Sequence, residues 1–329
     1  MTRVFSGIQP SGELHIGNYL GAVKNWVALQ HEHESFFCIV NYHAITAPYA
    51  PDDLRRRTRE MAVSLLASGL DPAKCVVFVQ SDVPEHTELQ WVFNTVTPLG
   101  ELERQVQFKD KAGKQEQVMA GLLNYPVLQA ADILLYRADT VPVGEDQVQH
   151  LELSRVVARN WNARFSPGAP YFPEPQPKLT PTRRIVGLDG QAKMSKSLNN
   201  TIGLLESPDE IWNKLRSAIT DPARQRKTDP GDPDKCKTIY ELHKAFSPVA
   251  TVAEVGENCR GAKWGCLDCK KVLHANLVEE LTPIRTRAEA LQGNVKLLEA
   301  TLEDGAERAR AVAKETMATV KDRMGLHGH

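Results

Sequence analysis

Apolar runs and helical patterns alternate along the first part of the chain. Apolar, β-branched runs occur at 3–8, 36–41, 76–80, 140–144 and 185–188, and helical patterns at 17–32, 52–68 and 87–97 separate the early ones. Continuous apolar strands that alternate with helices are typical of a parallel sheet covered on both faces. The pattern predicts an α/β fold with a Rossmann-type parallel sheet, whose ligands bind at the carboxyl ends of the strands.

The remaining segments suggest how the chain is divided. Residues 85–136 are mostly helical and are predicted to form an insertion between the third and fourth strands. Residues 166–181 contain six prolines, which predicts a loop with no regular element. From about 207 onward the pattern is helical: Ser207-Pro208-Asp209-Glu210 is a good helix start, and 276–323 predicts two or three amphipathic helices. We therefore expect two domains, 1–205 and an all-helical 206–329.

Composition narrows the possible classes of protein. The 329 residues are enough for two domains, and 40 basic residues against 41 acidic ones exclude a global basic field for nucleic acid. A local run such as Arg224, Arg226 and Lys227 can still hold nucleic acid, although from the residues alone a solvated surface loop is the better explanation. There is no run of membrane-spanning length and no signal-peptide pattern. We expect a soluble, cytoplasmic protein that binds neither membrane nor DNA.

Two short motifs far apart in the chain carry the chemistry. His15-Ile16-Gly17-Asn18 follows an apolar strand and a turn with Gly12, and it begins a helical pattern. A helix N-terminus after a glycine-rich turn receives phosphates, because free backbone N–H groups and the helix dipole point at the ligand. The second motif, 193–197, is a Lys-Met-Ser-Lys-Ser loop suited to holding a polyphosphate that must later leave.

Together, in this order, the two motifs resemble the HIGH and KMSKS signatures of class I aminoacyl-tRNA synthetases. Longer blocks at 5–12, 100–104, 130–136, 143–147 and 324–326 resemble the bacterial tryptophanyl-tRNA synthetases, and the match runs along essentially the whole chain. The resemblance implies a tryptophan–tRNA ligase, which activates L-tryptophan with ATP and transfers it to tRNA(Trp). It also implies a catalytic domain at 1–205, an anticodon-binding domain at 206–329, and a homodimer joined through the apolar helices of the insertion.

Two rival functions are weighed against this one. A tyrosyl counterpart is the nearest, because an aspartate can accept a phenol hydroxyl as well as an indole N–H. The 130–133 and 144–147 blocks favour the tryptophanyl enzyme. A non-catalytic paralogue that binds tRNA or senses tryptophan would have no use for both Lys193 and Lys196.

The expected ATP site contains groups that bind charge, with no nucleophile–base pair. Activation requires aligned reactants and stabilised phosphate charge more than proton transfer. Lys193 and Lys196 are expected to grip the β- and γ-phosphates with Mg²⁺, and Lys111 to be a third lysine, unless it is only a solvated charge. Adenine is placed by the resemblance against backbone near Ile185. The predicted ATP-binding residues are Gln9, Pro10, Ser11, His15, Gly17, Asn18, Gly144, Glu145, Asp146, Ile185, Lys193, Met194, Ser195, Lys196 and Ser197.

The expected tryptophan pocket needs apolar walls and one acceptor, because indole is flat and has a single N–H donor. Asp132 lies on an otherwise apolar helix, so we predict that it is buried, and the resemblance assigns it to the indole nitrogen. Its predicted neighbours are Phe5, Val40, His43, Tyr125, Val141, Val143 and Gln147. Tyr125 and Gln147 are assigned to the ammonium and carboxylate end. Gln129 stands where many family members have Met, which leaves the contacts to indole open.

The six cysteines do not suggest a disulfide scaffold. Cys38 and Cys75 are predicted to be small apolar residues in or beside buried strands. Cys236, Cys259, Cys266 and Cys269 have the spacing C-x22-C-x6-C-x2-C, which predicts a metal site. The spacing resembles that of a subset of bacterial tryptophanyl-tRNA synthetases with a [4Fe–4S] cluster. Zn²⁺ and unliganded thiols are the alternatives, and the site can serve as a structural staple.

Overall fold

The computed structural model describes residues 2–106, 108–109, 117–144, 148–179 and 185–326. Five strands form one parallel sheet in the order β3-β2-β1-β4-β5. The strands are β1 (Arg3–Ile8), β2 (Glu34–Ile39), β3 (Val76–Val79), β4 (Thr140–Val143) and β5 (Gln176–Leu179). β1 pairs with β2 in register from Arg3↔Glu34 to Ile8↔Ile39. The predicted Rossmann-type sheet is confirmed.

The fifth strand was predicted in the wrong place. β5 lies inside the proline-rich segment that was expected to be a loop, and it pairs with β4 from Thr140↔Gln176 to Val143↔Leu179. Pro177 is tolerated because β5 is an edge strand, where a missing N–H breaks no ladder bond on the outer side. The run at 185–188 adds no strand to the sheet, and within it Val186 forms only an isolated antiparallel bridge with Lys193.

Helices cover both faces of the sheet, as continuous apolar strands require. The helices before the insertion are α1 (Ile16–Asn18), the π-helical turn η1 (Tyr19–Val23), α2 (Lys24–Leu29), α3 (Asn41–Ala44), α4 (Pro51–Ala67) and the 3₁₀ turn η2 (Gln80–Asp82). A second 3₁₀ turn, η4 (Lys196–Leu198), follows β5. The insertion predicted at 85–136 contains α5 (Glu85–Asn94), α6 (Leu99–Glu103) and α8 (Ala120–Leu135), and α9 (Val148–Phe165) follows β4. None of the described helices is both long and apolar enough to cross a bilayer.

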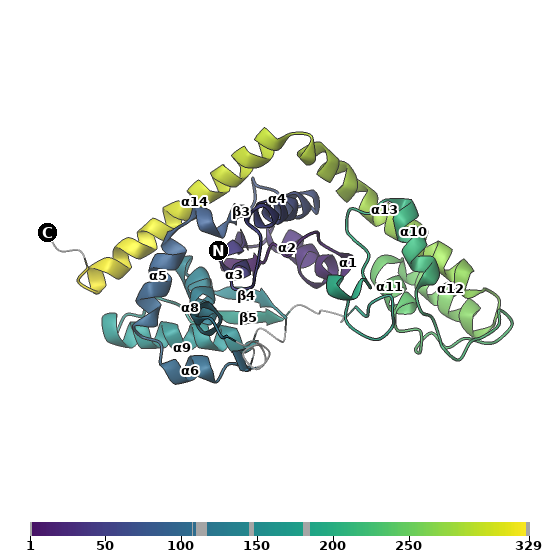
Figure 1. Ribbon diagram of the computed structural model, residues 1–329, viewed down its shortest axis with the longest axis horizontal. Coiled ribbons are helices and arrows are strands. Elements are labelled where there is room, and N and C mark those ends of the chain that lie inside the picture. The colour runs from purple at the N-terminus through teal and green to yellow at the C-terminus, as the bar shows by residue number, and fades with distance from the viewer. Residues whose placement is uncertain (1, 107, 110–116, 145–147, 180–184, 327–329) are drawn as a thin grey trace.

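The C-terminal region is helical, as predicted. It contains α10 (Pro208–Ser217), α11 (Ile239–Phe246), α12 (Val249–Arg260), α13 (Cys266–Gln292) and α14 (Val295–Arg323). Ser207 caps α10 in a capping box with Glu210, which confirms the predicted helix start. Figure 1 shows α13 and α14 as two long arms that meet at an angle, with α10, α11 and α12 beside the α13 arm.

The last helix packs against the sheet at its other edge. α14 lies against β3, where a Cβ on Gly305 would overlap the carbonyl oxygen of Val77. Glycine therefore lets the helix axis approach the strand closely. The contact covers an edge strand that would otherwise present unpaired backbone groups.

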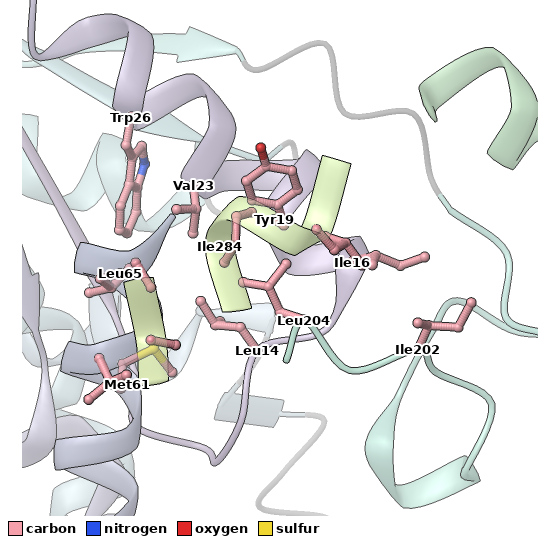
Figure 2. Close-up of a cluster of buried hydrophobic side chains, with 14 of the residues drawn as sticks. Leu14, Ile16, Tyr19, Val23, Trp26, Met61, Leu65, Ile202, Leu204 and Ile284 are labelled. Atoms are coloured by element: carbon pink, nitrogen blue, oxygen red, sulfur yellow. The ribbon is translucent and has the colours of Figure 1, made fainter. Parts of the chain in front are cut away.

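One apolar core joins segments that are far apart in the chain. Figure 2 shows side chains from the His15 segment and the following helices, from α4, from the segment after the lysine loop, and from α13 pointing toward one another. Leu14, Ile16, Ile202, Leu204 and Ile284 are each at most 2% exposed. The core therefore joins both signature motifs to α13.

Candidate functional site

A cavity of about 330 Å³ lies at the carboxyl ends of β1 and β4. Its lining includes most of the residues predicted for tryptophan: Phe5, Val40, His43, Tyr125, Gln129, Asp132, Val141 and Val143. Gln9 and Gly144, which were predicted for ATP, line the same cavity. Gln147, Glu145 and Asp146 lie outside the described residues, so their predicted roles stay predictions.

Asp132 is the polar centre of this pocket, and its predicted burial is confirmed at 1% exposure. His43 Nε2 donates to Oδ2 at 2.7 Å, and Gln80 Nε2 and His86 Nδ1 donate to Oδ1, each at 2.7 Å. Burial alone would raise the pKa of Asp132, but the charge and hydrogen bond of His43, together with those of His86, lower it to about 2. The side chain is therefore a carboxylate at neutral pH.

The three donors leave the carboxylate one acceptor position. Each carboxylate oxygen can accept about two hydrogen bonds, and Oδ1 already accepts two. Oδ2 accepts one, from His43, and can accept one more from a bound ligand. A donor such as an indole N–H matches this vacancy, whereas an acceptor would be repelled.

Two donors to Asp132 were not predicted from the sequence. His86 donates to Asp132 through Nδ1, and its Nε2 lies 2.8 Å from the hydroxyl of Tyr136. Burial raises the pKa of Tyr136 well above its usual value, which keeps this hydroxyl a donor. Gln80 directly follows β3, and a polar residue ending an apolar run at the carboxyl edge of the sheet was the available signal.

Tyr125 faces the pocket beside His43. Its ring contacts that of His43 edge-on at a centroid distance of 6.3 Å, and its hydroxyl is 3.0 Å from His150 Nε2. Burial raises the pKa of Tyr125 to about 12, so the hydroxyl is neutral. Gln129 lies on the same cavity wall, one helical turn before Asp132. Both side chains can therefore reach a bound ligand.

A second, more open cleft of about 770 Å³ follows the same strand, β1. It is lined on one side by Ser11, Gly12, His15 and Lys196, and on the other by side chains of α4 that include Arg57 and Glu60. Gly12 has a φ of +105°, which favours glycine, and a Cβ there would lie 3.0 Å from the ammonium of Lys196. The glycine turn thus gives the lysine room to enter the cleft.

His15 caps the helix that it begins. Its Nδ1 accepts from the backbone N–H groups of Gly17 at 3.1 Å and Asn18 at 3.3 Å, while the Asn18 side chain accepts from the His15 N–H. These two helix N–H groups are occupied, so the prediction that they are free for phosphate is wrong. The neutral ring must carry its proton on Nε2, which makes Nε2 a donor.

The charge state of His15 follows from its surroundings. Burial, together with the positive charges of Lys196 and Lys193, lowers the pKa of His15 to about 4. Gly17 is required next to this ring, because a Cβ there would lie 2.9 Å from His15 Nδ1. Room for the imidazole cap therefore accounts for the glycine that was predicted to make room for the nucleotide.

The lysine loop is tied to the His15 segment through its backbone. Ile185 accepts from the N–H of Met194 at 3.2 Å, and both side chains are buried, so these two predicted residues pack in the core. Further along, the Ile16 N–H donates to Ile202 at 3.0 Å and the Leu204 N–H to Leu14 at 2.7 Å. The two motifs therefore meet in space.

The remaining predicted ATP residues surround this junction. Lys193 and Lys196 are both exposed, and partial desolvation lowers the pKa of Lys196, an effect that the charges of Glu13 and Glu60 partly offset. Pro10 is buried in the turn after β1, and Ser195 donates its N–H to Asn200. Ser197 lies in η4. Lys111 lies outside the described residues.

The four C-terminal cysteines line one small cavity of about 20 Å³, together with Arg224 and Trp264. Arg224 lies 3.8 Å from the sulfur of Cys259, and His243 Nε2 lies 3.4 Å from that of Cys269. Burial raises the pKa of Cys269 to about 12, so its thiol is protonated here. Over the described residues, no group of three or more His, Cys, Asp and Glu is arranged as metal ligands.

Comparison with known proteins decides the family. The model of the tRNA synthetases class I (W and Y) matches residues 1–282. A tryptophan–tRNA ligase of Deinococcus radiodurans is 54% identical over 99% of each chain, and one of Gloeobacter violaceus is 46% identical over 98% of this chain and 96% of its own. The chain belongs to the bacterial tryptophanyl-tRNA synthetases of class I.

A solved structure agrees with this membership. The tryptophanyl-tRNA synthetase of Campylobacter jejuni, complexed with ADP and tryptophan, has a TM-score of 0.90 at 36% identity and covers 98% of this chain and all of its own. The similarity extends over the sheet, the insertion and the helical arms alike. The fold predicted from the two synthetase signatures is thereby confirmed.

Proposed function

We propose that this synthetase activates L-tryptophan with ATP to tryptophanyl-adenylate and then esterifies tRNA(Trp). The carboxylate of the amino acid attacks the α-phosphorus, and pyrophosphate leaves. The observation that carries the proposal is the ionised, buried Asp132 with one acceptor position open, in a cavity next to the His15–Lys196 cleft. An acceptor in an apolar cavity selects a flat substrate with one N–H, since an unpaired buried donor costs about 1–3 kcal/mol.

Each side chain then has a distinct task. We assign the indole to Phe5, His43, Gln129 and Asp132, and the ammonium and carboxylate end to Tyr125 and Gln147. His15 Nε2 donates to phosphate or ribose oxygens, and Lys193, Lys196 and Lys111 hold the departing pyrophosphate with Mg²⁺. The other predicted residues of the turn after β1, of the loop after β4 and of the lysine loop shape the ATP site.

Amino-acid-dependent pyrophosphate exchange tests this function. With all twenty amino acids compared, we expect exchange with tryptophan to exceed that with tyrosine by a large factor, followed by charging of tRNA(Trp). Exchange that prefers tyrosine would replace the proposal with the tyrosyl enzyme. Tryptophan binding without any exchange would indicate the non-catalytic paralogue.

We also propose the division of labour expected from the sequence, with catalysis in 1–205 and anticodon binding in 206–329. The helical region supports it through α10, α11 and α12, which lie along the α13 arm away from the sheet (Figure 1). α14 belongs to the same region but returns to pack on β3. We expect the protein to act in the cytoplasm.

The homodimer is proposed on the basis of exposed apolar side chains in the insertion. Trp91 on α5 is 73% exposed, and Leu99, Val106 and Met119 are each more than half exposed. Large apolar side chains of this kind are expected where a second copy covers them. Trp91→Glu should lower the mass in sedimentation, whereas Val249→Glu, at an even more exposed apolar position on α12, should not. A wild-type monomer would reject the dimer.

The four cysteines are proposed to hold a [4Fe–4S] cluster, with Zn²⁺ as the alternative. Their chemistry fits either metal, since thiolates bind both and all four line one cavity. When bound, either metal cross-links the segment at Cys236 to the start of α13.

Metal analysis on protein purified without air decides between these centres. A cluster gives brown protein with broad visible absorption that dithionite bleaches, and zinc gives colourless protein with one metal ion. Cys266→Ser should lose the metal yet keep tryptophan-dependent exchange, while Cys75→Ser, a change of a buried cysteine far from the cavity, should keep both. Metal-free wild type would leave the four thiols unliganded.

A further inference from the structure

Asn200 is a buried polar residue that joins three parts of the lysine loop. Its side-chain Oδ1 accepts from the Ser195 N–H at 2.7 Å, and its Nδ2 donates to Asp189 Oδ2 at 3.0 Å and to the Lys193 carbonyl at 3.5 Å. The residue is 3% exposed. The Asn200 carboxamide is thus hydrogen-bonded to the backbone on both sides of Met194, and also to Asp189 in the turn before the lysine loop.

The surrounding backbone is shaped to admit this side chain. A Cβ on Gly187 would overlap Nδ2 of Asn200, so only glycine leaves the space that the carboxamide fills. The Asn200 carbonyl also accepts from the Leu188 N–H at 2.9 Å. Asp189 is itself held by the Gln191 N–H at 3.1 Å, so it presents a fixed carboxylate to Asn200.

The same residue stands at the start of the segment that reaches His15. Two residues later the Ile202 carbonyl accepts from the Ile16 N–H, and Gly203 forms an antiparallel bridge with His15. Ile202 and Leu204, on either side of Gly203, are buried in the apolar core (Figure 2). Asn200 therefore lies between the lysine loop and the segment 202–204, which backbone hydrogen bonds hold against the His15 segment.

We propose that Asn200 is a positioning residue of the ATP site, whose carboxamide sets the placement of Lys193 and Lys196 relative to His15. It rests on the proposed function, because it acts through the two lysines. A misplacement of a phosphate-binding group by about 1 Å can cost roughly a hundredfold in rate, so one buried hydrogen-bonding group that spans the loop has large leverage.

Swapping the side chains of Asn200 and Asp189 tests the hydrogen bond between them. Asn200→Asp keeps the acceptor for Ser195 but sets a second carboxylate against Asp189, and we expect kcat for tryptophan-dependent exchange to fall about tenfold to a hundredfold. Asp189→Asn combined with Asn200→Asp restores a donor–acceptor pair in reverse and should recover most of the loss. Asn213→Asp, the same change at an exposed position on α10, serves as the control.

Two readouts separate positioning from mere folding. Tryptophan binding, followed by fluorescence, should stay unchanged in Asn200→Asp, since the pocket around Asp132 is a separate cavity. In a chain that already carries Lys193→Ala and Lys196→Ala, Asn200→Asp should cost little further rate, because the groups that it positions are gone.

Three results would overturn the proposal: unchanged exchange in Asn200→Asp, no recovery in the double variant, or an equal loss with and without the lysines. If Asn200→Asp does not fold, the double variant and the Asn200→Ser variant carry the test. Unchanged exchange in the two lysine variants themselves would overturn the assignment of the ATP site as well, so the two failures can be told apart.

Discussion

The amino-acid pocket and the phosphate cleft follow the same strand, yet they are built in opposite ways. In the pocket, the polar side chains are hydrogen-bonded to one another. Asp132 accepts three hydrogen bonds, and one of its donors, His86, also contacts the hydroxyl of Tyr136. In the cleft, backbone hydrogen bonds between distant segments hold the frame, and Lys196 is part of the lining. The pocket thus presents one fixed hydrogen-bond acceptor, which suits the selection of one substrate. The cleft presents positive charge on a loop, which suits the binding of a pyrophosphate that must later leave.

The largest effect should come from removing charge from the cleft. Lys196→Ala should lower kcat for adenylate formation about a hundredfold to a thousandfold, because the lysine stabilises charge that develops on the departing pyrophosphate. The affinity for tryptophan should hardly change. Pre-steady-state exchange and fluorescence binding measure the two, with the exposed Lys237→Ala as the control. An equal loss of tryptophan affinity would mean that the two sites are not separate.

Removing the acceptor from the pocket should act on the other substrate. Asp132→Ala should lower kcat/KM for tryptophan by an amount equivalent to about 1–3 kcal/mol of transition-state stabilisation, because the indole N–H is left unpaired. It should also lower the free energy of unfolding, since His43, Gln80 and His86 all lose their partner. The KM for ATP is the internal control. Wild-type kcat/KM in this variant would place the indole acceptor elsewhere, with Gln129 as the next candidate.

The pH dependence of His15 distinguishes a neutral donor from a cation. Its pKa in the folded protein is about 4, below the usual 6.5, so between these values the unfolded chain binds a proton that the folded one does not. Wild type should therefore lose stability relative to His15→Asn as the pH falls from about 6.5 to 4. Thermal unfolding of both proteins across this range measures the effect. A constant difference would show that His15 does not titrate in this window.

The smallest effect is expected where the C-terminal arm touches the helix that follows His15. The Tyr19 hydroxyl donates to Glu280 of α13 at 3.0 Å, and Lys24 pairs with the same oxygen at 2.8 Å. Tyr19→Phe should cost about 0.5–1.5 kcal/mol in urea unfolding, because Lys24 keeps Glu280 paired. Exchange activity should stay near wild type. A drop in activity that exceeds the stability loss would show that this contact acts on the cleft.

The outcome for the predicted residues depends on how far away their partners lie. Asp132 was recognisable because a lone carboxylate interrupts an apolar helix, and the cavity contains it with Phe5, His43 and Tyr125. Its donors Gln80 and His86 were missed because they lie 52 and 46 residues away. Gln80 had one local signal, its place at the end of an apolar run, and His86 had none. Asn200 was also missed, although Ser195 and Asp189 are only 5 and 11 residues away, because no periodic pattern marks the turn that brings them together.

The sequence by itself determined the first four strands and the helices between them, the cap at Ser207 and the residue content of the two signature motifs, because periodicity, capping and motif spacing are local properties. Tertiary structure alone decided that Pro177 lies in an edge strand and that His15 occupies the helix N–H groups expected to bind phosphate. It also brought the lysine loop to His15 through the bonds of Ile202 and Leu204. Strand order, side-chain satisfaction and contact between distant segments depend on what else is packed nearby, and no window of neighbouring residues contains that information.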